Sequence, residues 1–156
     1  MTNRASSQQP AARSHMQALQ HSDGYLIRLE RGEEVTATLT AFLEEKGIHA
    51  GTVMGLGGIG DAELGFYDLP NKTYLRRQVP GNLELVHYSG NITLVDGKPF
   101  IHAHAVVSGA DYQALSGHFF SANVVITGEF ILRPAQWEVS RTLDEFTGLK
   151  LMDLPK

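Results

Sequence analysis

The sequence predicts an α+β fold in which a mostly antiparallel central sheet carries one main helix. A single segment, after residue 34, spaces its apolar residues as a helix does. Nearly every later apolar segment is short, alternating or rich in β-branched residues, and ends at Gly, Pro or Asp-Gly, as strands do. The 156 residues are enough for one domain with a hydrophobic core and too few for two. We therefore expect a single domain without internal repeats.

The N-terminal segment, residues 1–22, is predicted to be a flexible leader, and residues 23–156 the domain. The leader is polar, rich in Ser, Gln and Ala, and carries two scattered arginines, Arg4 and Arg13. It lacks the apolar run of a signal peptide. The first strand is expected at residues 25–29.

The predicted helix follows this strand. Its apolar face consists of Val35, Leu39, Phe42 and Leu43. Acidic Glu33 and Glu34 precede it, Lys46 lies near its end, and Gly47 supplies the stop, which suits the helix dipole.

The rest of the chain is predicted to be β-structure. The expected strands are residues 50–54, 62–67, 73–79, 83–95, 100–108, 124–132 and 137–141, followed by an irregular tail at 143–154. Asp96 and Gly97 form a hairpin signal between two of these strands. The glycine-rich residues 55–60 are predicted to be a bend that lets strands approach closely. A phosphate-binding loop is disfavoured because a strand pattern follows and Asp61 and Glu63 would repel phosphate.

Composition excludes several classes of protein. Cysteine is absent, which removes disulfides, thiol catalysis, iron–sulfur clusters and cysteine zinc sites. The formal net charge of -4 disfavours binding to nucleic acid through phosphate contacts alone. No segment is long and apolar enough to span a membrane. A cytoplasmic location is therefore expected.

Three histidines in a segment of low charge are candidate metal ligands. His102 and His104 lie two apart on a predicted central strand, so their side chains leave the same face about 6.6 Å apart. Ser116 and Gly117 are predicted to form a bend that returns His118 to this pair. Three imidazoles with an open fourth position are typical of a catalytic zinc site. The alternative is that these histidines are neutral and hydrogen-bonded within a sheet or a subunit interface.

Glu84 is a candidate for a catalytic or supporting carboxylate. It alternates with Leu83 and Leu85 in a strand that the Asp96–Gly97 hairpin would place beside the histidine strand. The alternative is an ordinary outward-facing side chain. No other catalytic residue can be assigned.

Several motifs, in one order, cover about residues 23–152. They are residues 57–68 (GGIGDAELGFYD), 84–92 (ELVHYSGNI), 96–104 (DGKPFIHAH), 116–118 (SGH) and 141–149 (RTLDEFTGL). Together they resemble the plants-and-prokaryotes conserved (PPC) domain. This resemblance implies an α+β domain with a central antiparallel sheet, assembled as a homotrimer.

The resemblance also implies a link to DNA. Plant members of the family carry an AT-hook, an Arg-Gly-Arg-Pro arm that enters the minor groove, and bacterial members are commonly described as DNA-binding proteins. This sequence contains no Arg-Gly-Arg. DNA is therefore a partner that the missing hook and the acidic charge disfavour.

The fold of the PPC domain is similar to that of α-acetolactate decarboxylase, whose zinc is held by a His-x-His pair and a later histidine. His102, His104 and His118 match that order, which implies a divalent transition metal, with zinc the expected ion. Two functions follow as hypotheses. One is a trimeric, DNA-associated and transcription-associated module with a three-histidine metal site. The other is a metal-dependent, lyase-like enzyme acting on a small keto or hydroxy acid.

Overall fold

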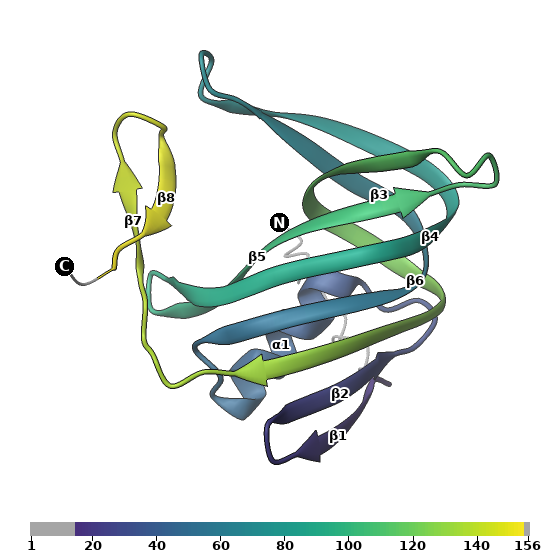
Figure 1. The fold of residues 1–156 in the computed structure, drawn as a ribbon, viewed down its shortest axis with the longest axis horizontal. Helices are drawn as coiled ribbons and strands as arrows, with labels where there is room; N and C mark the ends of the chain where they lie inside the picture. The colour runs from purple at the N-terminus through teal and green to yellow at the C-terminus, as the bar shows by residue number, and fades with distance from the viewer. Residues whose placement is uncertain (1–14, 155–156) are drawn as a thin grey trace, which may run out of the picture.

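A computed structural model describes residues 15–154 of the chain. These residues form antiparallel sheets and one helix, which confirms the predicted α+β class (Figure 1). In chain order the elements are β1 (Gln17–His21), β2 (Gly24–Leu29), α1 (Val35–Lys46), β3 (Gly51–Asp68), β4 (Thr73–Val95), β5 (Lys98–Ser108), β6 (Ala114–Pro134), β7 (Arg141–Asp144) and β8 (Leu149–Met152).

The main sheet closes on itself. Its strand order is β1-β2-β6-β3-β4-β5, and β5 pairs in addition with the start of β6. Strands β3, β4, β5 and β6 therefore form a ring of hydrogen-bonded neighbours, all antiparallel. The hairpin of β3 and β4 extends beyond this ring as an arm, and β7 and β8 form a separate hairpin (Figure 1).

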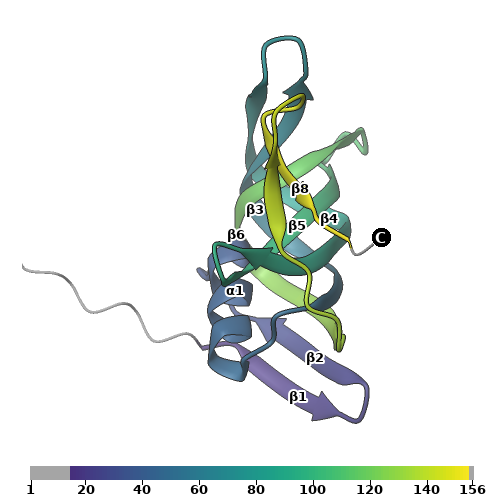
Figure 2. The same cartoon turned by 90° about the vertical axis from the view of Figure 1, so that its left-hand side faces the viewer.

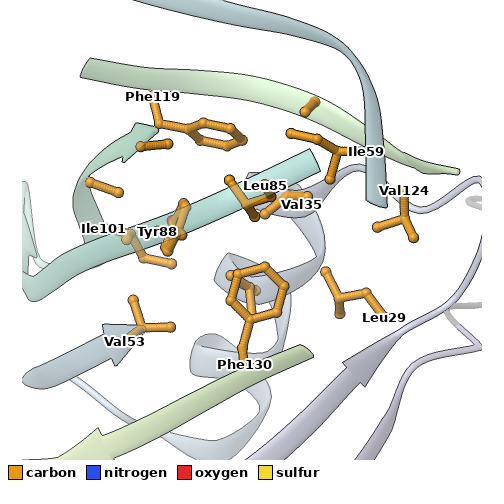
Figure 3. Packing of buried hydrophobic residues seen from close by; sticks show 14 of the residues in the cluster. Leu29, Val35, Val53, Ile59, Leu85, Tyr88, Ile101, Phe119, Val124 and Phe130 are labelled. Atoms are coloured by element: carbon orange, nitrogen blue, oxygen red, sulfur yellow. The ribbon is translucent and has the colours of Figure 1, made fainter. Parts of the chain in front are cut away.

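The helix begins and ends where the sequence predicts. The Glu34 carboxylate accepts hydrogen bonds from the N–H groups of Thr36 and Ala37, and Gly47 ends the helix at a left-handed φ of 63°. The four predicted apolar residues of α1 are buried in the core with the inner face of the sheet. Tyr88 and Phe130 are among the largest fully buried side chains there (Figure 3). From β5, the alternate residues Ile101, Ala103, Ala105 and Val107 belong to this core, so the histidines lie on the opposite face of the strand.

The long strands differ from the prediction because glycine and proline mark bulges and not strand ends. Residues 55–60 lie within β3, with register shifts between Gly55 and Gly57 and again between Gly60 and Ala62. The predicted close approach is confirmed, since a Cβ at Gly57 would lie 2.2 Å from the carbonyl oxygen of Thr127. No phosphate loop is formed.

The predicted strands 73–79 and 83–95 are one strand, β4. The chain passes through Pro80 and Gly81 without leaving the sheet, and the N–H of Gly81 donates to the carboxylate of Asp61 at 3.0 Å. In the same way the last long strand, predicted at 124–132, extends over residues 114–134 as β6. Bulges let these strands bend from the ring into the arm without breaking the hydrogen-bond ladder.

The two ends of the domain also need correction. Residues 17–21, expected within the leader, form β1, while residues 1–14 of that leader lie outside the described residues. All five residues of β1 are exposed, and the strand is held by its hydrogen-bonded pairing with β2. The polar composition of this segment therefore gave no sign that it forms a strand. Residues 137–140 form no regular strand, and the tail expected to be irregular contains the hairpin of β7 and β8.

Candidate metal centre

The pairing of β5 with β6 brings the three predicted histidines together. His104 on β5 lies directly opposite His118 on β6 in the antiparallel register. His102 is two residues from His104, so its side chain leaves the same face of β5. The prediction that these three side chains converge is therefore confirmed.

The imidazole rings form a nearly equilateral triangle. The ring centroids of His102 and His104 are 5.3 Å apart, those of His102 and His118 5.1 Å, and those of His104 and His118 5.4 Å. One nitrogen from each ring lies within 4.8 Å of the others. Zn–N bonds of about 2.0–2.1 Å hold ligand nitrogens roughly 3.5 Å apart. Side-chain rotations that move each nitrogen by about 1 Å would therefore bring all three onto one ion. Three imidazole nitrogens are a donor set that fits zinc.

The route by which His118 reaches the pair differs from the prediction. Ser116 and Gly117 are not a bend but part of β6, and the strand register alone delivers the imidazole. β5 has neighbours on both sides at this level, as predicted for a central strand. The face that carries the histidines is less buried than expected, since His104 is exposed and His102 and His118 are half-buried.

An aromatic wall borders the triangle on the side of the arm. The hydroxyl oxygen of Tyr74 lies 3.5 Å from Nδ1 of His118, and the Phe120 and His118 ring centroids are 4.7 Å apart. The two aromatic rings meet above Gly65, where a Cβ would lie 2.5 Å from Phe120 and 3.1 Å from Tyr74. The absence of a side chain at Gly65 therefore leaves room for the Phe120 ring and the edge of the Tyr74 ring against β3.

The hairpin of β7 and β8 supplies a buried arginine on another side of the triangle. The Arg141 guanidinium donates to Thr93 Oγ1 at 2.8 Å, to Asn91 Oδ1 at 2.9 Å and to the carbonyl oxygen of Lys150 at 3.2 Å. Its Nη2 lies 3.4 Å from Nδ1 of His102. The β7–β8 hairpin lies to one side of the main sheet in Figure 1 and is nearest the viewer in Figure 2.

The environment keeps two of the imidazoles neutral. Burial lowers the pKa of His118 to about 4, helped by the electrostatic influence of the neighbouring His102, His104, Arg76 and Arg141. Burial and the neighbouring Arg141 also lower the pKa of His102. Neutral imidazoles have a free lone pair for a metal at neutral pH, so the protonation state of these two rings suits metal binding.

Glu84 is not brought to the histidines. It is exposed and lies opposite Ser108, four residues along β5 from His104, or roughly 13 Å at the rise of a strand. The alternative of an outward-facing side chain therefore describes its position. Sequence reasoning missed Tyr74 and Arg141. Arg141 is the first residue of one of the motifs that resemble the PPC domain. Its place in that motif was the signal that could have marked it as a candidate site residue.

Fold and site together define a small α+β domain with a closed antiparallel sheet and a three-histidine cluster on its outer face. Residues 16–136 match the Plants and Prokaryotes Conserved domain, abbreviated PCC or PPC. The chain belongs to this family. None of the curated proteins matches it significantly.

Solved structures of the same fold include three informative relatives. A protein from Bacteroides thetaiotaomicron, provisionally named as DNA-binding, is 30% identical with a TM-score of 0.86, and the match covers 88% of this chain and 96% of that one. A metal-containing protein from Archaeoglobus fulgidus is 35% identical with a TM-score of 0.78, covering 90% and 98%. A PPC protein from Pyrococcus horikoshii is 26% identical with a TM-score of 0.79, covering 90% and 96%.

The helix among residues 15–154 is too short and polar to cross a membrane.

The lowered pKa of His118 predicts how the metal-free protein responds to acid. Below pH 6.5 the unfolded chain takes up a proton at this imidazole, and the folded chain resists it until about pH 4. The free energy of unfolding should therefore fall as the pH drops through this window. His118→Asn removes the proton site, so its stability should fall less steeply in urea unfolding with EDTA between about pH 7 and pH 4.5. His49→Asn, an exposed control, should keep the wild-type slope. Equal slopes in His118→Asn and wild type would contradict the assignment.

Proposed function

We propose that this PPC-domain protein binds one divalent transition metal per chain through His102, His104 and His118. The single observation that carries the proposal is the convergence of three imidazole nitrogens within 4.8 Å on neighbouring strands. Two of these rings are kept neutral by burial, which is the form that binds a metal. The metal-containing relative from Archaeoglobus fulgidus, 35% identical, supports the same reading.

Zinc is the ion we propose. Imidazole nitrogen suits zinc well, and three protein ligands leave a position for water or substrate. His104 is exposed, so that position would be reachable from solvent. A bound zinc would supply Lewis-acid activation of an oxygen on a ligand or on water.

We also propose that the chain assembles as a homotrimer. Five exposed apolar side chains lie on neighbouring strands of the main sheet: Leu26, Met54, Leu56, Val86 and Ile131. We call these residues the apolar patch. Leu26, Ile131 and Met54 are direct cross-strand neighbours. A contiguous apolar surface of this kind is typical of a subunit interface, and a trimer agrees with the family resemblance.

Two roles for the metal protein follow. The names of relatives, such as the provisionally named DNA-binding protein from Bacteroides thetaiotaomicron, favour a DNA-associated, transcription-associated module. The exposed position of His104 favours the alternative, a metal-dependent, lyase-like enzyme acting on a small keto or hydroxy acid.

The metal proposal predicts a stoichiometry that depends on the cluster. Untagged protein reconstituted with zinc and desalted should retain about one ion per chain by elemental analysis. His118→Asn should retain less than roughly a third of that amount, because two imidazoles bind zinc far more weakly than three. His49→Asn, which changes an exposed histidine outside the cluster, should match wild type. Wild type that retains no more zinc than His118→Asn would contradict the metal centre.

The trimer predicts that a charge in the apolar patch dissociates the assembly. Ile131→Glu should shift the mass measured by light scattering from three chains towards one, because a carboxylate would lose its hydration in the interface. Phe146→Glu places the same charge at an exposed position of the β7–β8 turn and should remain trimeric. Monomeric wild type, or a trimeric Ile131→Glu, would rule out this interface.

The DNA role predicts binding that is strongest at low salt. Fluorescence anisotropy with an A·T-rich duplex should show association at about 20 mM salt that weakens steeply towards about 200 mM, as phosphate contacts release counterions. A G·C-rich duplex of the same length tests preference for sequence. If no association occurs at the lowest salt, the DNA role is eliminated, whereas the metal proposal is unaffected.

A further inference from the structure

The three-histidine cluster has positive neighbours, and no carboxylate among residues 15–154 pairs or hydrogen-bonds with its imidazoles. Arg141 approaches His102 from β7 at 3.4 Å. Arg76, on β4, stacks its guanidinium 3.8 Å from the centre of the Phe120 ring, which itself borders His118. Metal-bound histidines are usually supported by a carboxylate or a carbonyl oxygen, and a guanidinium cannot play that part because it has no acceptor.

A cleft lies on the side of the arm; none of the three histidines lines it, and Tyr74 stands between it and the cluster. The cleft has a volume of about 320 Å³ and lies between the β3–β4 arm and the β7–β8 hairpin, lined in part by Lys72, Tyr74 and Arg76. Tyr74 belongs to both features, since it lines the cleft and its hydroxyl lies 3.5 Å from His118. Tyr74 and Arg76 are two residues apart on β4 and so share one face of the strand, and Lys72 precedes them in the β3–β4 turn.

The carboxylates near this cleft are already engaged. Glu63 pairs with Arg76 at 3.3 Å, a long contact for an ion pair between two side chains. Asp144 accepts hydrogen bonds from the N–H and hydroxyl groups of Thr147. A dication on the three imidazoles would add two positive charges beside Arg141, which lies 3.4 Å from His102, and Arg76, whose charge acts on His118.

We infer that the metal centre takes a small molecule bearing an oxyanion, a carboxylate or a phosphate, whose charge is met by the metal and by Arg76 in this cleft. The inference rests on the proposed metal centre and names the chemical class of its ligand. A cleft of about 320 Å³ is at the small end of ligand pockets, which suits a metabolite. Arginine recognises both carboxylate and phosphate groups with its planar fork, and Tyr74 adds a hydroxyl group beside them.

The test uses the full-length protein loaded with cobalt(II), whose visible absorption reports on its ligands. Acetate and inorganic phosphate are titrated in separate experiments, and the response tells which oxyanion is preferred. We expect a saturable change in absorption with at least one of them. Arg76→Gln should weaken that affinity roughly tenfold, the loss typical of a charge-assisted contact, without changing the cobalt content.

Arg77→Gln is the matched control. Arg77 is the next residue of β4, is exposed, and lies on the opposite face of the strand, so it removes the same charge from a different place. Its affinity should stay within about twofold of wild type, because distant surface charges are screened by salt. Equal losses in the two variants would overturn the assignment of Arg76.

The remaining outcomes separate the inference from the proposal beneath it. A protein that takes up no cobalt contradicts the metal centre and this inference with it. A protein that takes up cobalt but shows no response to either anion contradicts the inference alone. If Arg76→Gln weakens binding to an A·T-rich duplex and leaves both small anions unaffected, the cleft serves the DNA backbone and the small-molecule assignment is wrong.

Discussion

The site depends on the register between β5 and β6. His104 faces His118 because Phe119, the next residue of β6, is buried in the core against Tyr88, with the ring centroids 5.2 Å apart. A slip of one residue would turn His118 inward and Phe119 outward. That slip is unfavourable because the core would lose a large buried ring. Gly117 reinforces the same register, since a Cβ there would lie 2.6 Å from the carbonyl oxygen of Gly65. The geometry of the histidines is thus set by packing on the opposite side of the sheet.

Closure of the sheet explains why a cluster on an outer face is still partly sheltered. The arm turns Tyr74 towards His118, and the β7–β8 hairpin places Arg141 beside His102. The hairpin and the arm are themselves joined, because the Tyr67 hydroxyl donates to the carbonyl oxygen of Thr147 and Lys72 Nζ donates to that of Glu145. The imidazoles lose part of their hydration in this corner, and that loss favours their neutral form.

The sequence was sufficient for the helix, the fold class and the identity of the clustered histidines. The helix followed from apolar spacing with Gly47 as a stop, the fold class from turn signals such as Asp96–Gly97, and His102 and His104 from their place on one strand face. The bend expected to bring His118 to them is instead part of β6. The predicted strand lengths were wrong because Pro80 and Gly81 are residues typical of turns but lie in a bulge of β4. Residue type alone does not distinguish a turn from a bulge. The role of Arg141 depends on how the last hairpin packs against β4, which is a tertiary contact between segments about 50 residues apart.

Charge decides between the two kinds of ligand that this surface could meet. Tight binding to duplex DNA needs several phosphate contacts, each releasing counterions. Around the cluster, Arg141 is buried and held by three hydrogen-bond acceptors, which leaves Lys72 and Arg76 as the exposed cations of the cleft. Assembly would multiply these cations, but every added chain also brings a net charge of -4. A small oxyanion needs only one metal and one guanidinium to meet its charge. These contacts are short, so the net negative charge of the molecule opposes them less than it opposes a long polyanion. The cleft is therefore better matched to a single anionic group than to a polyanion.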